Sequence, residues 1–540
     1  MHTTLSLILA LTLASAPGFK NPIINSDYSD PDAICVNGEY WMTASSFGCA
    51  PGLQILHSTD LLNWEIVGAA LPEGVSTYAR DLADGPGAKA SPGLVPHGDG
   101  VFAPSIRYRE STKEFFIFWG DPDRGIYQVH TQTPQGKWSE PVLVKEGKGY
   151  IDTCPLFDED GRVYLVHGWA GSRAGFNSVL SLVELNSDAT ECISAESMIF
   201  DGRATRNPTV EGPKFYKKDG HYYIFAPAGG VQDGWQLVLR SKSPYGPYEW
   251  RRVLEAGGNA THGPHQGAWV QDAKGDDWFI HFEDRYAWGR VVHLQPLKWD
   301  KEGWCIIGVD NDSDGIGEPV LEGKAPAAFP ARPLGGVGAE ETSTSFEGTS
   351  IPLNWQWASA PEYSWYMTSP AEKALRLNCR KQAEGFRNLW DCPQMLLEKL
   401  VGPSMELNAS LEFQPSYKGD RAGMIVMGAQ YCTIELYYDG TDVYLQRRIC
   451  LFAERGGKET IAESVKLDSK KVNLKIRVHE EGKNWPPVVM AEFLYEDAEG
   501  QFKTLGEPFK AAAGKWIGAK AGFFATAEIH RNEGGCVYIR

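Results

Sequence analysis

The stretch EGPKFYKKDGHYYIF, from Glu211 to Phe225, contains the pattern that decides the fold. It opens on an acidic residue, passes through a short apolar run, turns at Asp219-Gly220 and enters a second, aromatic run. An Asp-Gly pair between two apolar runs is a strong signal for a tight β-hairpin. The stretch therefore predicts two adjacent antiparallel strands.

The same pattern occurs five times before residue 310, each time as an opening residue, an apolar strand, a polar turn and an aromatic strand. Successive copies begin 73, 49, 59 and 54 residues apart, which suits four-stranded sheets with loop insertions. We therefore predict an all-β fold with a five-bladed β-propeller over residues 21–321. A pair of β-sandwiches is the alternative, but it does not account for the regular period. The opening residues are Asp30, Ala103, Asp152, Glu211 and His265.

The composition of the chain changes after the fifth repeat. Residues 322–344 are rich in Ala, Pro, Gly, Ser and Thr and are predicted to be a linker. From residue 345 to 540 the apolar runs are longer and the repeat is absent, which predicts a β-sandwich as a second domain. Residues 1–16 hold an apolar run that ends in Ala-Ser-Ala, so we expect a signal peptide and a secreted, extracellular protein, or a periplasmic one in a bacterium.

The charge of the chain limits its partners. It has 52 Lys and Arg against 69 Asp and Glu, a net charge of −17, which disfavours binding to a phosphate backbone. No later stretch approaches the 18 uninterrupted apolar residues of a membrane span, so neither nucleic acid nor a membrane is expected as a partner. The many Trp and Tyr residues can pack cores or stack on sugar rings. The sequence makes no prediction of the oligomeric state.

Three of the five opening residues are acids: Asp30, Asp152 and Glu211. The innermost strands of a propeller begin at the same end of the central channel, so these side chains should face one another. Each acid alone could be an ordinary turn or strand entry. Together they place like charges in one channel mouth, which costs free energy and favours a functional role. An inverting glycosidase uses such carboxylates as a base and an acid on either side of a sugar.

The propeller resembles glycoside hydrolase family 43, the β-xylosidases and α-L-arabinofuranosidases. The phrases that carry this resemblance are Asn21-Pro-Ile-Ile24, Ser29-Asp-Pro-Asp32, Phe102-Ala-Pro-Ser-Ile-Arg107, Ile151-Asp152 before Asp158-Glu-Asp-Gly161, Val210-Glu-Gly-Pro213 and Trp288-Gly-Arg-Val291. The resemblance implies that Asp30 is the general base, Asp152 the pKa modulator and Glu211 the general acid. It further implies that Arg290 hydrogen-bonds the bound sugar.

The resemblance also suggests further ligands. His265 resembles the family histidine at the channel centre, which in many members helps to hold a hydrated calcium; no cofactor is required, and calcium is an optional ion. Phe47 and Trp288 lie beside family-like phrases and are expected to stack on the sugar. The run from Asp310 to Gly315 begins like a calcium-binding loop, but Leu321 stands where that loop needs Glu, which favours a polar turn.

The second domain resembles the concanavalin-like sandwich of many of these enzymes, through Phe346-Glu-Gly, Asn388-Leu-Trp390 and Asp420-Arg-Ala-Gly-Met-Ile425. In relatives this domain narrows the active site to a pocket. We therefore expect an inverting, exo-acting hydrolase that releases terminal xylose or arabinofuranose from hemicellulose or pectic side chains, with plant cell-wall oligo- or polysaccharide as substrate. The alternatives are a non-catalytic carbohydrate-binding propeller and an endo-acting arabinanase on the same fold.

Overall fold

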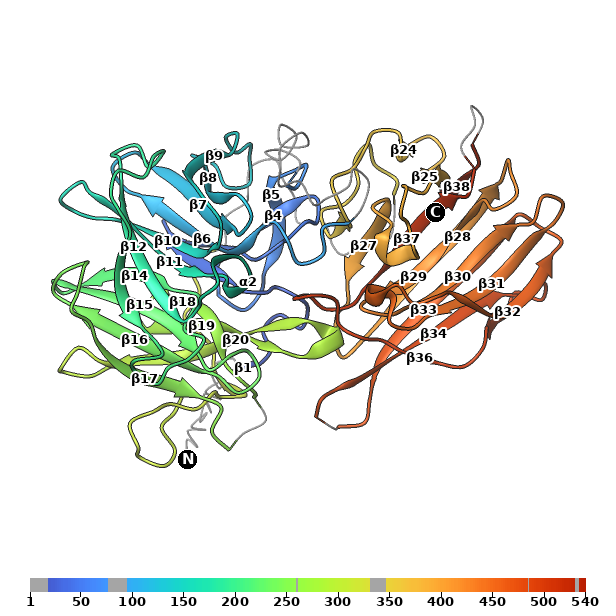
Figure 1. The fold of residues 1–540 in the computed structure, drawn as a ribbon. Coiled ribbons are helices and arrows are strands. Elements are labelled where there is room, and N and C mark those ends of the chain that lie inside the picture. Colours follow the sequence, from blue (N-terminus) through green and yellow to red (C-terminus); the bar gives the residue numbers. More distant parts are fainter. Residues whose placement is uncertain (1–17, 76–94, 259–260, 331–345, 484, 530–533) are drawn as a thin grey trace, which may run out of the picture.

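The computed structural model describes residues 18–75, 95–258, 261–330, 346–483, 485–529 and 534–540. The described chain is almost entirely β-structure, arranged as two lobes that lie side by side (Figure 1). The first lobe is a five-bladed propeller and the second is a sandwich of two sheets, so the predicted fold class is confirmed. The expected signal peptide, residues 1–16, lies outside the described residues.

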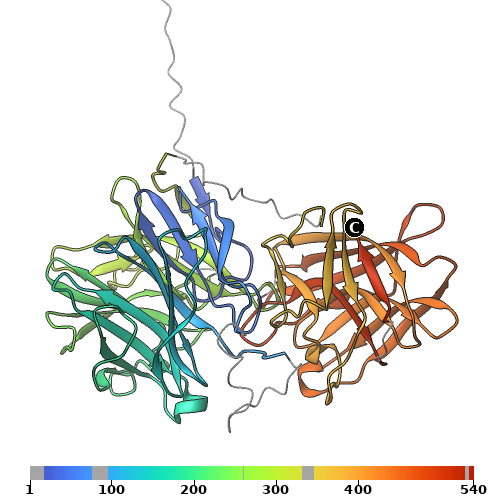
Figure 2. The ribbon, with the colours of Figure 1, turned by 90° about the horizontal axis from the view of Figure 1, so that it is seen from above.

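Each propeller blade is a four-stranded antiparallel sheet whose strands follow one another in sequence. Figure 2 shows the blades from above, with the sandwich beside them. The strands are β2–β5 (Asp32–Val36, Glu39–Thr43, Gly52–Ser58, Glu65–Leu71), β6–β9 (Phe102–Arg109, Glu114–Asp121, Gly125–Thr131, Val142–Glu146), β10–β13 (Tyr150–Phe157, Val163–Trp169, Val179–Leu185, Ser197–Asp201), β14–β17 (Lys214–Lys218, His221–Ala228, Trp235–Ser241, Glu249–Glu255) and β18–β21 (His265–Gln271, Asp277–Asp284, Arg290–Trp299, Cys305–Ile307).

The predicted hairpin of the fourth repeat forms as β14 and β15. The two strands pair from Lys214 with Phe225 to Lys218 with His221. The turn residues Asp219 and Gly220 have φ angles of 49° and 74°, because a tight hairpin that follows the twist of its strands needs left-handed residues at both positions.

The structure moves the end of the propeller beyond the predicted boundary at residue 321. β22 (Glu322–Lys324) pairs with β1 (Gly18–Lys20), so residues expected in the linker belong to a small sheet of the propeller. The ring of Phe329 lies 5.7 Å from that of Tyr40, and its amide donates to the Thr59 carbonyl at 2.8 Å. Apolar contact with blade one therefore holds the first part of the expected linker; residues 331–344 lie outside the described chain.

The sandwich consists of two eight-stranded sheets. One sheet holds β23 (Trp355–Trp357), β26 (Arg380–Lys381), β27 (Met395–Lys399), β29 (Arg421–Met427), β30 (Tyr431–Tyr438), β31 (Val443–Cys450), β32 (Thr460–Leu467) and β37 (Lys520–Ala527). The other holds β24 (Tyr366–Ser369), β25 (Ala374–Asn378), β28 (Ser404–Gln414), β33 (Lys471–Glu481), β34 (Val488–Glu496), β35 (Phe502–Thr504), β36 (Phe509–Lys510) and β38 (Cys536–Ile539).

Helical structure in the described chain is limited to short turns, namely α2 (Gly171–Ala174), η2 (Tyr286–Trp288), η3 (Leu389–Asp391) and η4 (Ala453–Arg455). Among the described residues, no helix has the length and apolar character needed to cross a membrane.

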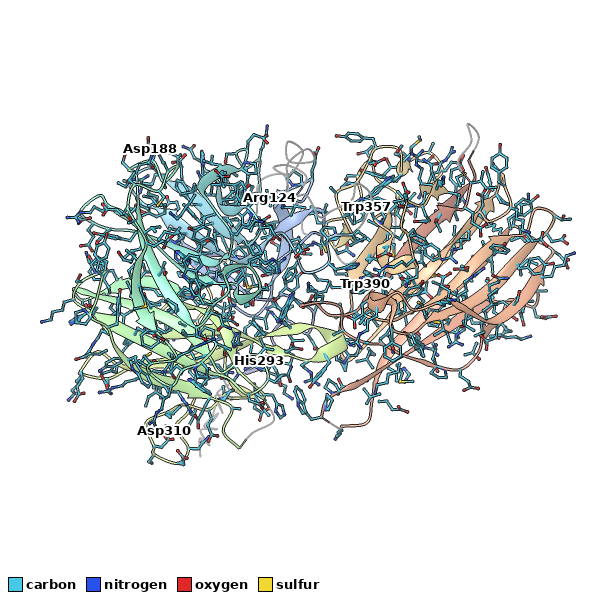
Figure 3. All side chains as sticks on the ribbon, in the orientation of Figure 1. Arg124, Asp188, His293, Asp310, Trp357 and Trp390 are labelled. Carbon is cyan, nitrogen blue, oxygen red and sulfur yellow. The ribbon has the colours of Figure 1, made fainter. Side chains whose placement is uncertain are left out.

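Polar and aromatic contacts join the two lobes. Trp357 and Trp390 lie on the side of the sandwich that faces the propeller (Figure 3). The amide of Trp357 donates to the Ala50 carbonyl at 2.6 Å, and the ring of Trp390 stacks on His97 with centroids 3.6 Å apart. The sandwich is therefore packed directly against blade one and the chain leading to blade two.

Candidate active site

The start of every inner strand shares one backbone feature. A residue at or next to each opening position has a positive φ, and in β6, β10 and β18 the strand pairing shifts register at this point. A bulge of this kind turns side chains out of the regular strand pattern, and left-handed non-glycine residues carry strain that functional sites retain. The five residues and their φ angles are Asp30 (55°), Ala103 (32°), Asp152 (59°), Gly212 (56°) and Gln266 (36°).

Asp30 is held by three donors. Oδ2 accepts hydrogen bonds from the hydroxyls of Ser29, at 2.8 Å, and Ser45, at 2.6 Å. Oδ1 accepts from Nη1 of Arg290 at 3.3 Å. The side chain is buried. The carboxylate is thus fixed in one orientation, and every group that holds it is a hydrogen-bond donor.

Asp152 lies on blade three, close enough to Asp30 and Glu211 for their charges to act on it. Its Oδ2 accepts a hydrogen bond from the amide of Gly212 at 2.7 Å, the residue directly after Glu211. Burial raises the pKa of Asp152 well above its ordinary value, and the negative charges of Glu211 and Asp30 raise it further. The structure therefore brings the three predicted carboxylates together, and their proximity makes Asp152 harder to ionise than an ordinary aspartate.

Glu211 is the most accessible of the three acids. Its side chain is 33% exposed, whereas Asp30 and Asp152 are both 4% exposed as residues. Nε2 of His265 lies 2.9 Å from Oε1 of Glu211. A carboxyl group that reaches solvent from a fixed position can exchange a proton with a substrate oxygen.

Arg290 begins β20 and reaches back to the first blade. Besides Asp30, its Nη1 donates to the Ser29 hydroxyl at 2.8 Å, and its backbone amide donates to Oδ1 of Asp27 at 2.9 Å. The predicted arginine therefore lies beside the predicted base, where a guanidinium can contact a bound sugar.

The structure corrects the expected stacking roles of Trp288 and Phe47. Trp288 is 1% exposed, donates from Nε1 to Glu480 at 2.9 Å and belongs to the apolar core that joins the two lobes. Phe47 is 3% exposed and packs edge-on against Phe102 with centroids 5.3 Å apart. Neither ring presents a face to a sugar, because neighbouring side chains cover both.

Two residues of the site were not predicted from the sequence. Ser45 connects blades one and two, since its hydroxyl contacts Asp30 and also accepts from the Ala103 amide at 2.8 Å. Trp516 comes from the sandwich, is 52% exposed, and its ring centroid lies 5.8 Å from Cζ of Arg290. No repeat marks Ser45, and Trp516 belongs to a different domain, so neither had a signal in the sequence pattern.

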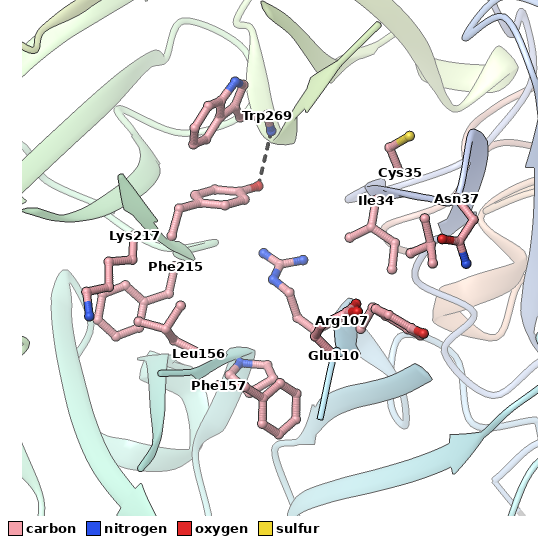
Figure 4. A pocket seen from close by; sticks show the side chains of 14 residues that line it. Ile34, Cys35, Asn37, Arg107, Glu110, Leu156, Phe157, Phe215, Lys217 and Trp269 are labelled. Carbon is pink, nitrogen blue, oxygen red and sulfur yellow. Dashed lines mark hydrogen bonds between the residues drawn. The ribbon is translucent and has the colours of Figure 1, made fainter. Parts of the chain in front are cut away.

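The opposite end of the channel opens into a cavity of about 440 Å³ (Figure 4). The inner strands of all five blades line it, through residues that include Ile34, Tyr108, Leu156, Tyr216 and Trp269. None of the three carboxylates is among its lining residues, so the cavity is separate from the candidate active site.

The channel centre leaves polar atoms that could contact a hydrated cation. Nε2 of His265 contacts Glu211, whereas the buried Nδ1 of His265 and the buried Oε1 of Gln266 have no hydrogen-bond partner among the described residues. These atoms would hold the ion in part, and water would supply the other oxygens that calcium prefers. In the described chain, the carboxylate oxygens that gather closely enough to hold a metal are those of Asp310, Asp312 and Asp314. Those of Asp310 already accept amides of its own exposed turn. Asp310 is far from the channel, on a loop at the lower edge of the propeller (Figure 3).

The fold and the site define a carbohydrate-cleaving enzyme, a glycoside hydrolase. Sequence comparison matches residues 19–305 to the model of glycosyl hydrolases family 43, and residues 343–538 to that of the β-xylosidase C-terminal concanavalin A-like domain. The chain belongs to glycosyl hydrolases family 43.

Individual relatives agree with this assignment. A candidate β-xylosidase of Xylanibacter ruminicola is 32% identical over 515 residues, 94% of this chain and 86% of the relative. A non-reducing end α-L-arabinofuranosidase of Bacteroides ovatus is 28% identical over 76% of this chain and 73% of its own. The crystal structure of a xylan β-1,4-xylosidase from Bacillus halodurans shares the fold, with a TM-score of 0.79, 22% identity, and coverage of 96% of this chain and 99% of that one.

Proposed function

We propose that this protein is an inverting, exo-acting glycosidase that releases terminal xylose or arabinofuranose from hemicellulose or pectic side chains. The observation that carries the proposal is the contrast between two acids in one channel mouth. Asp30 is buried and held by three donors, whereas Glu211 is partly exposed and, among the residues that the structure describes, is held by His265 alone. That contrast supports one fixed base and one accessible acid, the pair that hydrolysis with inversion requires.

In the proposed reaction, Asp30 removes a proton from the attacking water while Glu211 protonates the leaving glycosidic oxygen. Arg290 keeps Asp30 in place and hydrogen-bonds the sugar. Asp152 modulates the acid: it holds the backbone of Gly212, and its charge state changes the field at Glu211. No step of this mechanism uses a cofactor.

The exo-acting mode is supported by the way the sandwich closes one side of the site. Beside Arg290, the backbone of Gly518 in the sandwich packs directly against the backbone of Gly289 in the propeller. The two are so close that the Cβ atom of any other residue at position 518 would lie 2.7 Å from the amide nitrogen of Gly289. Trp516, two residues earlier, then lies over the guanidinium. An active site that is closed on one side by a second domain can accept the end of a sugar chain more readily than its middle. The relatives named as a candidate β-xylosidase and as an α-L-arabinofuranosidase support the two pentoses.

The test is hydrolysis of nitrophenyl β-D-xyloside and nitrophenyl α-L-arabinofuranoside by the wild type and by Glu211→Gln. Proton NMR of the first product should show the inverted anomer, and plant oligosaccharides should yield monosaccharide from the start. Sugar binding without hydrolysis would instead identify a carbohydrate-binding propeller. Early release of oligosaccharides from arabinan would identify an endo-acting arabinanase.

We also propose that the chain is exported through residues 1–16, to the outside or to a periplasm, where plant cell-wall polymers are met. The apolar run that ends in Ala14-Ser15-Ala16 supports this proposal. Mass spectrometry of protein recovered outside the cytoplasm should show a mature chain that begins near residue 17. Recovery of the full-length chain from the cytoplasm alone would contradict export.

A further inference from the structure

Cys49 and Lys520 form a buried contact between the two lobes. Cys49 lies in the loop between β3 and β4 of blade one, and Lys520 begins β37 of the sandwich. Nζ of Lys520 donates to Sγ of Cys49 at 3.1 Å, although the two residues are 471 positions apart in the chain. Cys49 is 9% exposed and Lys520 is 6% exposed. An amine and a thiol from different domains are therefore in direct contact away from solvent.

Backbone contacts across the interface hold both residues in place. Directly after the cysteine, Ala50 pairs with Trp357 of the sandwich as an isolated β-bridge. Directly before the lysine, the amide of Ala519 donates to the carbonyl of Ala287 in the propeller at 2.8 Å. Since each residue is adjacent to a hydrogen bond between the lobes, the nitrogen and the sulfur meet in a fixed geometry.

The amine of Lys520 lacks a carboxylate partner. Besides the sulfur, its acceptor is the neutral Oε1 of Gln356 at 3.5 Å, and no carboxylate among the described residues forms an ion pair with Nζ. A second lysine of this interface, Lys399, donates to the neutral Oε1 of Gln54 at 3.0 Å. Burial lowers the pKa of Lys399 to about 7, and the positive charge of Lys520 acts in the same direction. A buried ammonium without a counterion costs free energy, so a reaction that leaves Nζ of Lys520 uncharged is favoured by its surroundings.

A small cavity adjoins the pair. It has a volume of about 40 Å³ and is lined by both Cys49 and Lys520. The rest of its lining is mostly apolar and includes Val95, Leu397 and Trp390, the last of which is labelled in Figure 3. A cavity needs about 10–15 Å³ of such volume to hold one water molecule, and apolar cavities take up small nonpolar molecules. Dioxygen is a molecule of this kind, so the cavity can hold it next to both side chains.

We propose that Cys49 and Lys520 react with dioxygen to form a covalent N–O–S bridge, which links the propeller to the sandwich and is opened by a dithiol reductant. The S–H bond and one N–H bond break, the O–O bond breaks, and one oxygen atom bonds to both Nζ and Sγ. The two hydrogens leave with the other oxygen atom as water. Nitrogen and sulfur each lose two electrons, and dioxygen takes up all four.

The bridge answers the charge problem at the interface. An ammonium–thiolate pair carries the same three hydrogens as an amine and a thiol, so the balance holds for either form, and the bridged nitrogen is uncharged. Two molecules of a dithiol return the four electrons and regenerate the amine, the thiol and water. This inference does not depend on the proposed glycosidase function.

The first test looks for the bridge by peptide mass spectrometry of the full-length wild type, purified in air or without oxygen in dithiothreitol. In the air sample, the peptides that contain Cys49 and Lys520 should be joined, with one oxygen more and two hydrogens fewer than the two free peptides together, a difference of about 14 Da. Dithiothreitol should release both peptides unmodified. An air sample with only free peptides, or with Cys49 oxidised alone, would overturn the inference.

The chain contains a matched internal control. Nζ of Lys145 lies 3.6 Å from Sγ of Cys192, but this lysine also forms an ion pair with Glu196 at 3.5 Å. Because the carboxylate compensates the charge of the ammonium, we expect no bridge at this second pair. Linkage of Cys192 to Lys145 to the same extent would overturn the inference that the domain interface selects Cys49 and Lys520.

The second test measures what the bridge does to the fold. Since the bridge ties the two lobes together, dithiothreitol should lower the unfolding temperature of the air-purified wild type by roughly 5–10 °C. Lys520→Met removes the amine, so its unfolding temperature should be the same with and without reductant, whereas Cys192→Ser should respond as the wild type does. A wild type whose unfolding temperature ignores the reductant would overturn the linking role. Mass spectrometry of the wild type decides the inference even if Lys520→Met does not fold.

Discussion

Nε2 of His265 lies 2.9 Å from Oε1 of Glu211, so the residues that open blades four and five are joined by a hydrogen bond across the channel mouth. Among the described residues, Oε2 of Glu211 has no hydrogen-bond partner. The histidine therefore fixes one carboxyl oxygen and leaves the other to face the substrate. This arrangement suits a group that must deliver a proton to one defined position.

The first prediction concerns Glu211→Gln. The variant keeps the hydrogen bond to His265 but has no proton to give, so kcat/KM on a natural oligosaccharide should fall by about 10²–10⁴-fold. The loss should be much smaller for a dinitrophenyl glycoside, whose leaving group needs no protonation. Steady-state kinetics on both substrates check this. An equal loss on both would remove Glu211 from the role of general acid.

The second prediction concerns Asp30→Asn. Activation of water is needed whatever the leaving group, so both substrates should lose about 10²–10⁴-fold in kcat/KM. Ser45→Ala is the companion variant, because it removes only the 2.6 Å hydrogen bond to Asp30 and should cost about tenfold or less. A variant at Asp30 that still hydrolyses the dinitrophenyl glycoside at the wild-type rate would show that the base lies elsewhere.

The propeller and its acid cluster were predictable because they are encoded locally and repeatedly. Turns such as Asp219-Gly220 mark each hairpin, and the regular spacing of the hairpins implies a ring in which Asp30, Asp152 and Glu211 meet. Their partners depend on closure of the ring or on bulges, as with the Gly212 amide that holds Asp152. The pattern of residue types in the sequence therefore predicts the blades but does not predict these contacts.

The aromatic residues show where prediction from sequence position fails. Trp288 stands beside a family-like phrase, yet its indole donates to Glu480, 192 residues away on the sandwich. Trp516 is far from every such phrase and lies over Arg290. Whether an aromatic ring is buried or exposed depends here on how the two domains pack against each other. The residue pattern of either domain alone does not predict that packing.

The third prediction compares these two tryptophans. Trp516→Ala should raise KM for the terminal sugar by roughly tenfold, as expected for about 1.4 kcal/mol of lost contact, and leave the unfolding temperature nearly unchanged because half of the ring is exposed. Trp288→Ala should instead lower stability by about 3–5 kcal/mol, since it empties a buried site between the lobes. Calorimetry and kinetics on both variants separate the two roles. A large loss of stability in Trp516→Ala would make that ring structural.

The last prediction follows from the pKa of Asp152, which burial and then the charges of Glu211 and Asp30 raise. The folded protein therefore binds the proton on the Asp152 carboxyl group more tightly than the unfolded chain does. The contribution of Asp152 to stability is fully present below the ordinary pKa of aspartate. That contribution is lost as the pH rises toward the folded pKa. Asp152→Asn removes this loss of stability, because asparagine does not ionise, and it keeps an oxygen that can accept the hydrogen bond from the Gly212 amide. The variant should therefore be less active but more stable at neutral pH, by roughly 2–4 °C for each kcal/mol, and should match the wild type in acid.

Asp158, at the other end of the same inner strand, provides the control with the opposite sign. Burial acts to raise its pKa, but hydrogen bonds from Lys217 and Tyr222 outweigh that effect and hold the pKa below its ordinary value. Its contribution to stability is therefore present above the ordinary pKa of aspartate and lost in acid. Asp158→Asn should lower the unfolding temperature at neutral pH and leave the pH profile of activity in place. Thermal unfolding of both variants from pH 4 to pH 8 checks the pair, and a fall in the unfolding temperature of Asp152→Asn at neutral pH would show that its charge stabilises the fold.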